Sequence, residues 1–346
     1  MAEELKIGIL GVGGIAQIAH LPALRKAENV RLTAICDAAE DLLRRIGQQY
    51  DVDDLYTDHR KFLDKADMDA VLIPVAHAYH ATLSIDAMRA GKHVLVEKPM
   101  AVTLAECREM VQTSKETGTQ LQVACMKRYD PGLQFARRFV QEEMGERLSV
   151  SGWYCDSVYH GQYVTSLTGP RASSNLQRRP TERIQDLHLN MVLGHGVHLI
   201  DTLRFFGGDI VAVTTEMAQK DHDIVSVSLL EFADGARGTA QLMVRVRMDW
   251  CEGLMVHGVG GSVLAKIPFP YRYVGSEVTV FDAERKEYRS PPTPDADPYE
   301  RQLEGFAAAI LEGRDVSPNV EDGLADQRVI LGMHESQKLA KRVVTT

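Results

Sequence analysis

The sequence lacks a long apolar run, paired cysteines and an excess of positive charge. No run of 18 or more apolar residues occurs, which argues against a membrane-spanning helix. The five cysteines are scattered, with no CxxC pair of the kind that binds zinc or exchanges disulfides. The formal net charge of -9 argues against nucleic acid or an anionic membrane as a partner.

What remains is the composition of an ordinary globular protein. Hydrophobic residues make up 45% and charged residues 25%, which excludes a disordered or fibrous chain. A length of 346 residues exceeds what one core usually organises and predicts two domains. The start, MAEELKIGILG, reaches a strand-like run too early for a secretory signal, so we expect a cytoplasmic protein.

The first part of the chain alternates between strands and helices. Strand-like runs, each followed by an amphipathic segment, occur at KIGILG, RLTAICD, DAVLIPV, HVLVEK and QLQVACM. Such alternation predicts a parallel sheet with helices on both faces, an α/β Rossmann domain over residues 1–126. Thr103 and Glu106 form a capping box before one of these helices, and Gly118 follows it as a stop.

Residues 127–346 are predicted to form an α+β domain with a mainly antiparallel sheet. A helix near 131–144 precedes seven strand candidates joined by short turns. A helical pattern at about 183–206 interrupts them, and the arginine-rich stretch before it, TGPRASSNLQRRPTER, is interpreted as a loop over the site. Two last helices, within about 299–341, are candidates to pack back on the first domain.

A glycine motif follows the first strand. GVGGIA at 11–16 matches G-x-G-x-x-G/A between a strand and a helix, which places a pyrophosphate on the helix N-terminus. Glycines in a tight strand-to-helix turn are the alternative interpretation, and the strand-to-helix context favours the nucleotide. The predicted cofactor-binding residues of this turn are Gly11, Gly13, Gly14, Ile15 and Ala16.

Two further strand ends carry charge. Asp37 ends the second strand, where its carboxylate can accept hydrogen bonds from the hydroxyls of the adenine ribose. The same charge would repel a 2′-phosphate, so Asp37 predicts NAD rather than NADP as the cofactor. The alternative role for Asp37 is that of a helix N-cap, and the two roles are compatible. Glu97 and Lys98 leave the strand HVLVEK at the carboxyl edge, where ligands bind in open α/β sheets.

Together, GVGGIA, Asp37, AGKHVLVEKP and the later GVHLID resemble the glucose-fructose oxidoreductase and inositol dehydrogenase family, Gfo/Idh/MocA, over nearly the whole chain. The resemblance implies a Rossmann domain joined to an open-faced antiparallel sheet. It also implies NAD(H) or NADP(H) as cofactor, of which Asp37 favours NAD, and oxidation or reduction of a carbinol. The outer face of the sheet is then expected to form a homodimer or homotetramer.

The family's motifs assign roles to individual residues. Lys98 is expected to contact the reacting hydroxyl, and Glu97 to hydrogen-bond the cofactor ribose. MKRYDP at 126–131 resembles a family strand end, so Arg128 and Tyr129 are expected to contact substrate. A structural ion pair is the equally weighted alternative for Arg128. His80 matches a cofactor-proximal histidine, although Val75, Ala76 and His77 replace the usual Thr-Pro-Asn; packing at the helix N-terminus is the alternative for both histidines.

The helix motif D-x-G-x-H-x-x-D departs from the family at its first position. His198 and Asp201 match, but Gly194 stands where the first aspartate is expected. In a regular helix Gly194 and His198 share one face, whereas His195 is rotated by about 100 degrees from position 194. We therefore expect Lys98 and His198 to be catalytic and His198 also to bind substrate. His195 is either an auxiliary catalytic residue or a packing residue. We expect no metal site, because no third ligand lies close in the sequence to His195 and His198.

These residues predict an NAD-dependent dehydrogenase that acts on CH–OH groups of a sugar, inositol or related polyol. One alternative is an NAD-dependent enzyme that cleaves glycosides through transient oxidation. Another is a non-catalytic NAD-responsive regulator, since a fold serves many functions and Gly194 removes an acid–base group. Retention of Lys98 and His198 argues against the regulator.

Overall fold

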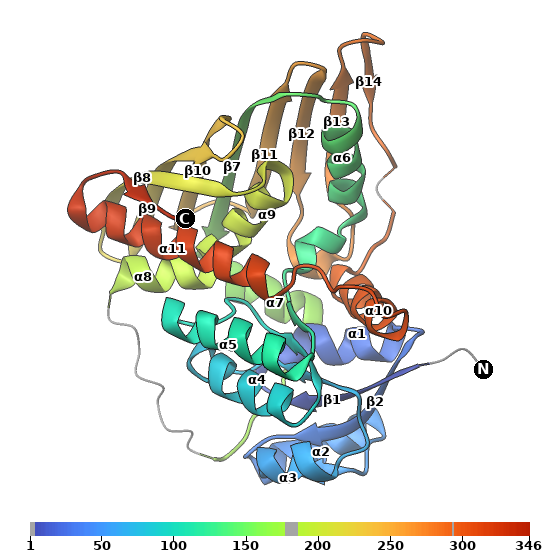
Figure 1. Cartoon of the computed structure of the whole chain (residues 1–346). Helices are drawn as coiled ribbons and strands as arrows, with labels where there is room; N and C mark the ends of the chain where they lie inside the picture. Colours follow the sequence, from blue (N-terminus) through green and yellow to red (C-terminus); the bar gives the residue numbers. More distant parts are fainter. Residues whose placement is uncertain (1–3, 177–185, 293) are drawn as a thin grey trace. The chain divides into compact units, whose positions relative to one another are not determined.

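The computed structural model of the chain describes residues 4–176, 186–292 and 294–346 (Figure 1). The chain divides into two compact units. Of the described residues, the first unit comprises 4–126, 168–176 and 299–324, and the second comprises 127–167, 186–292, 294–298 and 325–346. Among the described residues, no helix is both long and apolar enough to cross a membrane.

The first unit is built on a six-stranded parallel sheet with strand order β3-β2-β1-β4-β5-β6. Its strands are short and rich in buried β-branched and leucine side chains, as expected for a sheet that is covered on both faces. They are β1 (Leu5–Leu10), β2 (Val30–Cys36), β3 (Leu55–Tyr56), β4 (Ala70–Ile73), β5 (His93–Val96) and β6 (Leu121–Val123). The predicted Rossmann architecture is confirmed.

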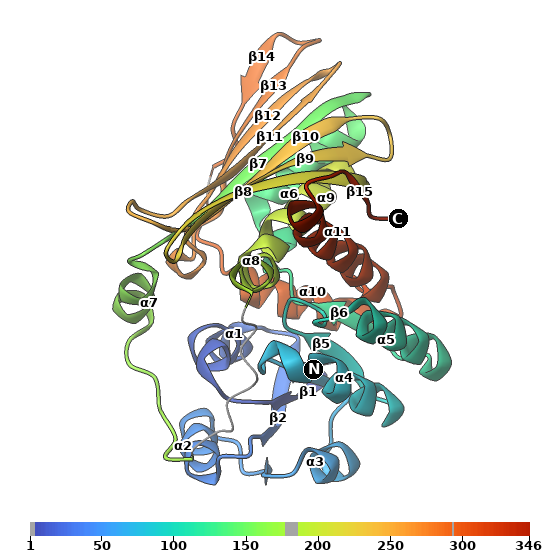
Figure 2. The ribbon, with the colours of Figure 1, turned by 90° about the vertical axis from the view of Figure 1, so that its left-hand side faces the viewer.

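Helices cover both faces of this sheet (Figure 2). One face carries α1 (Leu21–Lys26), which follows the π-helical turn η1 (Ala16–His20), and α2 (Glu40–Tyr50). The other face carries α3 (His59–Lys65), α4 (His80–Arg89), which follows the 3-10 turn η2 (His77–Tyr79), and α5 (Leu104–Thr117). Here Phe62, Met88 and Met110 pack on Val71 and Val94. The capping box of α5 is present, and Gly118 ends that helix in the left-handed conformation.

The second unit is built on a nine-stranded sheet with strand order β14-β13-β12-β11-β7-β10-β9-β8-β15. Every described pairing is antiparallel except that of β7 with β10. The strands are β7 (Arg147–Ser157), β8 (Ile210–Lys220), β9 (Asp223–Phe232), β10 (Arg237–Val246), β11 (Cys251–Gly258), β12 (Gly261–Ile267), β13 (Glu277–Asp282), β14 (Glu287–Arg289) and β15 (Val343–Val344). The predicted mainly antiparallel second domain is confirmed.

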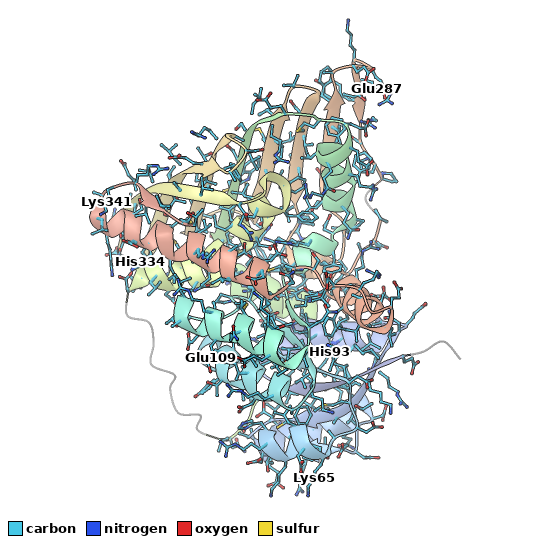
Figure 3. The ribbon with its side chains drawn as sticks, viewed as in Figure 1. Lys65, His93, Glu109, Glu287, His334 and Lys341 are labelled. Atoms are coloured by element: carbon cyan, nitrogen blue, oxygen red, sulfur yellow. The ribbon has the colours of Figure 1, made fainter. Side chains whose placement is uncertain are left out.

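Helices lie on one face of this sheet, and no helix of the described chain covers the other (Figure 2). The covered face carries α6 (Pro131–Glu142), α8 (Leu187–Met191), α9 (Val197–Gly207) and most of α11 (Val320–Leu339), on which His334 is labelled in Figure 3. A Cβ on Gly152 of β7 would lie 3.0 Å from Leu203 of α9, so this glycine lets the helix approach the sheet closely. The remaining helical elements are α7 (His160–Thr168), α10 (Pro298–Leu311), and the 3-10 turns η3 (Met126–Tyr129) and η5 (Pro270–Arg272).

The helical pattern predicted at about 183–206 is not one regular helix. Residues 183–185 lie outside the described residues, and α8 and α9 are joined by a π-helical turn, η4 (Val192–Gly196). A π turn holds an extra residue and rotates the side chains that follow it. The predicted angles among Gly194, His195 and His198, which assume regular α-helix geometry, are therefore wrong.

Candidate functional site

The glycine turn of the first unit has the geometry of an anion-binding loop. Gly11 adopts φ +103, and a Cβ built there would lie 2.6 Å from Cγ1 of Val75, so only glycine fits. The carbonyl of Gly13 accepts the Gln17 N–H at 3.1 Å, which begins the helical turn. Ala16 is buried at the start of η1, whereas Gly14 is exposed. The exposed glycine thus lies at a helix N-terminus, where a phosphate is stabilised.

Asp37 is buried between this turn and the start of α2. Its Oδ2 accepts the Val12 N–H at 3.0 Å, and its Oδ1 accepts the Ala39 N–H at 2.9 Å. The N-cap of α2 is Ala39 itself, without a side-chain hydrogen bond, so Asp37 is not the N-cap. Backbone donors therefore fix the carboxylate at the end of β2, and the turn and carboxylate together fit a dinucleotide.

Glu97, at the end of β5, uses both carboxylate oxygens within the protein. Its Oε1 lies 2.8 Å from Nε2 of His20, and its Oε2 accepts the backbone N–H of Lys98 at 3.0 Å. Burial raises the pKa of Glu97, but the hydrogen bond and charge of His20 outweigh it and lower the pKa. Glu97 is only 4% exposed. This geometry favours a role in fixing the backbone of Lys98 over the predicted ribose contact.

His80 fixes the other side of Lys98. Its Nδ1 lies 2.7 Å from the carbonyl oxygen of Pro99, and its Nε2 lies 3.1 Å from that of Val75. The side chain is fully buried, and burial lowers its pKa, so the neutral ring is favoured. His80 therefore packs and hydrogen-bonds within the fold, the alternative raised for it from the sequence, while Lys98 is half-buried at the strand end.

Two histidines of the second unit, His195 and His198, contact Tyr154 of β7. The ring of His198 stacks on Tyr154 with centroids 5.9 Å apart, and Nδ1 of His195 lies 3.3 Å from the Tyr154 hydroxyl. Burial, with the charges of Glu252 and Asp156, raises the pKa of Tyr154 well above its ordinary value, so it stays a neutral donor. Both histidines are half-buried.

A carboxylate that the sequence did not reveal stands behind His195. Oδ2 of Asp156 lies 4.0 Å from Nε2 of His195, and its Oδ1 lies 2.8 Å from Nδ1 of His160. Asp156 is buried near the end of β7, whereas the side chain of His160 is 38% exposed. The unit therefore contains a polar line from Tyr154 to the surface. In the sequence, only the charged residue near the end of this strand, within CDS, indicates it.

Arg128 forms a buried ion pair with the Asp201 of the GVHLID motif. Nη2 of Arg128 lies 2.7 Å from Oδ1 of Asp201. Nearby, Nη1 of Arg204 lies 2.7 Å from Oδ1 of Asp326. Burial and the charge of Asp201 raise the pKa of Asp326, although both arginines oppose the shift. This arrangement favours the structural alternative for Arg128 over substrate contact.

Two other side chains complete the η3 turn. Tyr129 is half-buried at its end. Lys127 forms an ion pair with the buried Glu252 and places its ammonium 4.9 Å from the centroid of the Tyr154 ring. Burial raises the pKa of Glu252, and the charge of Lys127 opposes that shift. This pair was not predicted, because the two residues are far apart in the sequence.

Comparisons with known proteins agree with this geometry. A family model described as oxidoreductase family, NAD-binding Rossmann fold, matches residues 5–125, and one described as GFO/IDH/MocA C-terminal domain matches residues 162–264. An inositol 2-dehydrogenase from Rhizobium meliloti (strain 1021) is 27% identical over 338 residues, which cover 93% of this chain and 93% of that protein.

Two solved structures share the fold over almost the whole chain. One is aldose-aldose oxidoreductase from Caulobacter crescentus, complexed with glycerol, with a TM-score of 0.80 at 22% identity. The match covers 99% of this chain and 100% of that chain. The scyllo-inositol dehydrogenase from Lactobacillus casei with bound NAD(H) and scyllo-inositol has a TM-score of 0.77 at 20% identity, with 99% of each chain covered. At these identities the likeness shows the fold.

Proposed function

The chain belongs to the Gfo/Idh/MocA family of NAD-binding oxidoreductases, and we propose that it transfers hydride between NAD and a carbinol carbon of a sugar, inositol or related polyol. The full-length likeness to an inositol 2-dehydrogenase supports this substrate class. The resemblance inferred from GVGGIA and HVLVEKP is confirmed, and so is NAD as cofactor.

The observation that carries the proposal is the cluster around Tyr154. His195 and His198 are both half-buried and both contact this one ring, and a carboxylate lies behind His195. Groups that bind hydroxyls and accept protons are thereby concentrated within one unit. A regulator that only sensed NAD would not need such a proton-accepting group.

Each residue then has a distinct part in the reaction. When bound at the glycine turn and Asp37, NAD would supply the acceptor for the hydride of the carbinol carbon. The ammonium of Lys98 stabilises the negative charge that develops on the oxygen, and a ring nitrogen of His198 accepts the hydroxyl proton, so that the alcohol becomes a carbonyl. We propose that His195, Asp156 and His160, which extend from the Tyr154 hydroxyl to the partly exposed ring of His160, help to return the proton to solvent. Asp156 thus supplies, from a strand, the carboxylate that Gly194 lacks.

A substrate panel tests the proposal. Inositols, pyranoses, sugar acids and glycosides are each incubated with the purified protein and NAD, and absorbance of NADH is followed. We expect at least one polyol or sugar to produce NADH. Release of an aglycone without net NADH would favour the glycoside-cleaving alternative, and no reaction with any member would favour the regulator.

Asp37 is expected to select NAD over NADP. The buried carboxylate accepts ribose hydroxyls and repels a 2′-phosphate, and alanines rather than arginines follow it. Asp37→Ala should raise the Kd for NAD by about tenfold or more, the scale of a lost charged hydrogen bond, and the Kd for NADP far less. Cofactor fluorescence titration gives both constants, and the exposed Asp53→Ala is the control. Tighter binding of NADP than of NAD by the unmodified protein would contradict the assignment.

The open face of the second sheet is proposed to join subunits. Strand pairing places exposed Leu229, Met255 and Leu264 in one row across the sheet, with Thr239 of β10 and Ser151 of β7 between Leu229 and Met255. Several large exposed apolar side chains on one face of a sheet are typical of an interaction surface. Light scattering should give the mass of a dimer or tetramer of the 38.4 kDa chain, and Leu229→Lys with Leu264→Lys should reduce that mass. The mass of one chain for the unmodified protein would refute this.

A further inference from the structure

A segment remote in sequence lies against the nucleotide-binding elements of the first unit. The described residues 168–176 belong to that unit, although residues 127–167 before them and 186–292 after them belong to the second. The described part of this segment has no helix or strand after Thr168 and runs beside α2 (Figure 2). Its hydrogen bonds, rather than regular structure, fix its position.

The side-chain amide of Gln17, in η1, hydrogen-bonds both the backbone N–H and the backbone carbonyl of Ala172. Its Oε1 accepts the Ala172 N–H at 2.8 Å, and its Nε2 donates to the Ala172 carbonyl at 3.1 Å. The same Nε2 also donates to the carbonyl of Val12, within the glycine turn, at 2.8 Å. One amide side chain therefore links this segment to the loop that binds the cofactor phosphates.

Two residues of α2 hold the next part of the segment. Oδ1 of Asp41 accepts the Ser174 hydroxyl at 2.6 Å, and its Oδ2 accepts the Asn175 N–H at 2.9 Å. Nη2 of Arg45 donates to the Ser173 carbonyl at 2.6 Å. The hydrogen bonds from Ser174 and Asn175 lower the pKa of Asp41, so its charged form holds the segment at neutral pH. The segment thus runs from the glycine turn to the helix that follows Asp37.

Arg171 lies in the part of the segment that is next to the glycine turn, where the cofactor phosphates are expected. A Cβ built on Gly14 would lie only 3.0 Å from Nη1 of Arg171, so the guanidinium stands directly beside the glycine turn. Arg171 is exposed, and its charge therefore remains available to a ligand. Arginine pairs with phosphate oxygens through short, charge-assisted hydrogen bonds.

We propose that residues 171–175 form a strap over the adenosine diphosphate half of NAD, in which Arg171 binds the pyrophosphate. Release of the cofactor then requires the strap to leave Gln17, Asp41 and Arg45, so the strap slows dissociation. Lid opening of this kind limits turnover in many enzymes. The strap depends on NAD binding by the first unit and not on the carbinol chemistry, so it stands if the proposed substrate class is wrong.

Cofactor binding without substrate tests the strap. Arg171→Gln removes the phosphate contact, Arg45→Gln removes an anchor, and Arg44→Gln, which removes an exposed pair with Glu40, is the matched control. All three arginines are exposed, so the variants are expected to fold. Fluorescence titration gives the Kd for NADH, and stopped-flow displacement gives its dissociation rate.

Arg171→Gln should raise the Kd for NADH and for ADP about tenfold, with little change for adenosine, which lacks phosphate. Arg45→Gln should raise the NADH dissociation rate by about threefold to tenfold, and Arg44→Gln should leave it unchanged. The strap is refuted if Arg171→Gln binds NADH and ADP as tightly as the unmodified protein. It is also refuted if the control variant releases NADH as fast as Arg45→Gln does.

Discussion

Replacing His198 by Asn should lower kcat by roughly a hundredfold to ten-thousandfold, the scale of a lost general base. The stacked Tyr154 ring holds His198 in one orientation, and asparagine keeps a polar group there without a nitrogen that accepts a proton near neutral pH. The Kd for NAD should stay nearly unchanged, because the substitution leaves the glycine turn and Asp37, which are expected to bind the cofactor, as they are. NADH absorbance gives the rate, and cofactor fluorescence gives the affinity.

His195→Asn and Asp156→Asn serve as comparison variants. Both interrupt the polar line to His160 but leave His198 in place, so each should lower kcat less than His198→Asn does. A His198 variant that turns over normally across the neutral pH range would place the proton acceptor elsewhere. A larger loss in His195→Asn would transfer the role of principal base to His195.

Lys98→Met should abolish most activity, with a loss of at least about a hundredfold to a thousandfold in kcat, as for a lost donor to a developing oxyanion. Methionine keeps the length of the side chain and removes its charge. Two hydrogen bonds of the neighbouring backbone remain. One joins the Lys98 N–H to Glu97, and the other joins His80 to the Pro99 carbonyl. The backbone should therefore stay in place, and kcat should fall far more than NAD affinity does.

Lys65→Met is the matched control for Lys98→Met. Lys65 lies exposed in the last turn of α3 and is labelled in Figure 3. This control should retain full activity. Near-normal kcat for Lys98→Met on the true substrate would show that another cation stabilises the oxygen.

Much of the fold follows from local sequence. Alternating strands and helices, the glycine turn and the capping box at Thr103 each rest on residues close together in the chain, and each is present. The strand-to-helix context of GVGGIA also distinguished a nucleotide site from an ordinary turn. Asp37 lies where the motif predicts it, although its carboxylate binds Val12 and Ala39 rather than capping a helix.

The supporting residues of the site were not predictable in this way. His20 reaches Glu97, and Asp156 reaches His195, across long stretches of sequence that no local pattern connects. The π turn at Val192–Gly196 was missed because its residues also fit a regular helix. Glu97 was expected to face the cofactor because it ends a strand, but its burial against His20 is a tertiary effect.

The fate of the carbinol hydrogen tests the central claim most directly. The best substrate of the panel is prepared with deuterium on the reacting carbon and mixed with protein and NAD, and the nicotinamide is analysed by mass spectrometry. Direct hydride transfer predicts that the reduced cofactor carries the deuterium. Reduced cofactor without the label, or loss of the label to solvent water while NAD stays oxidised, would contradict oxidation of the carbinol by hydride transfer.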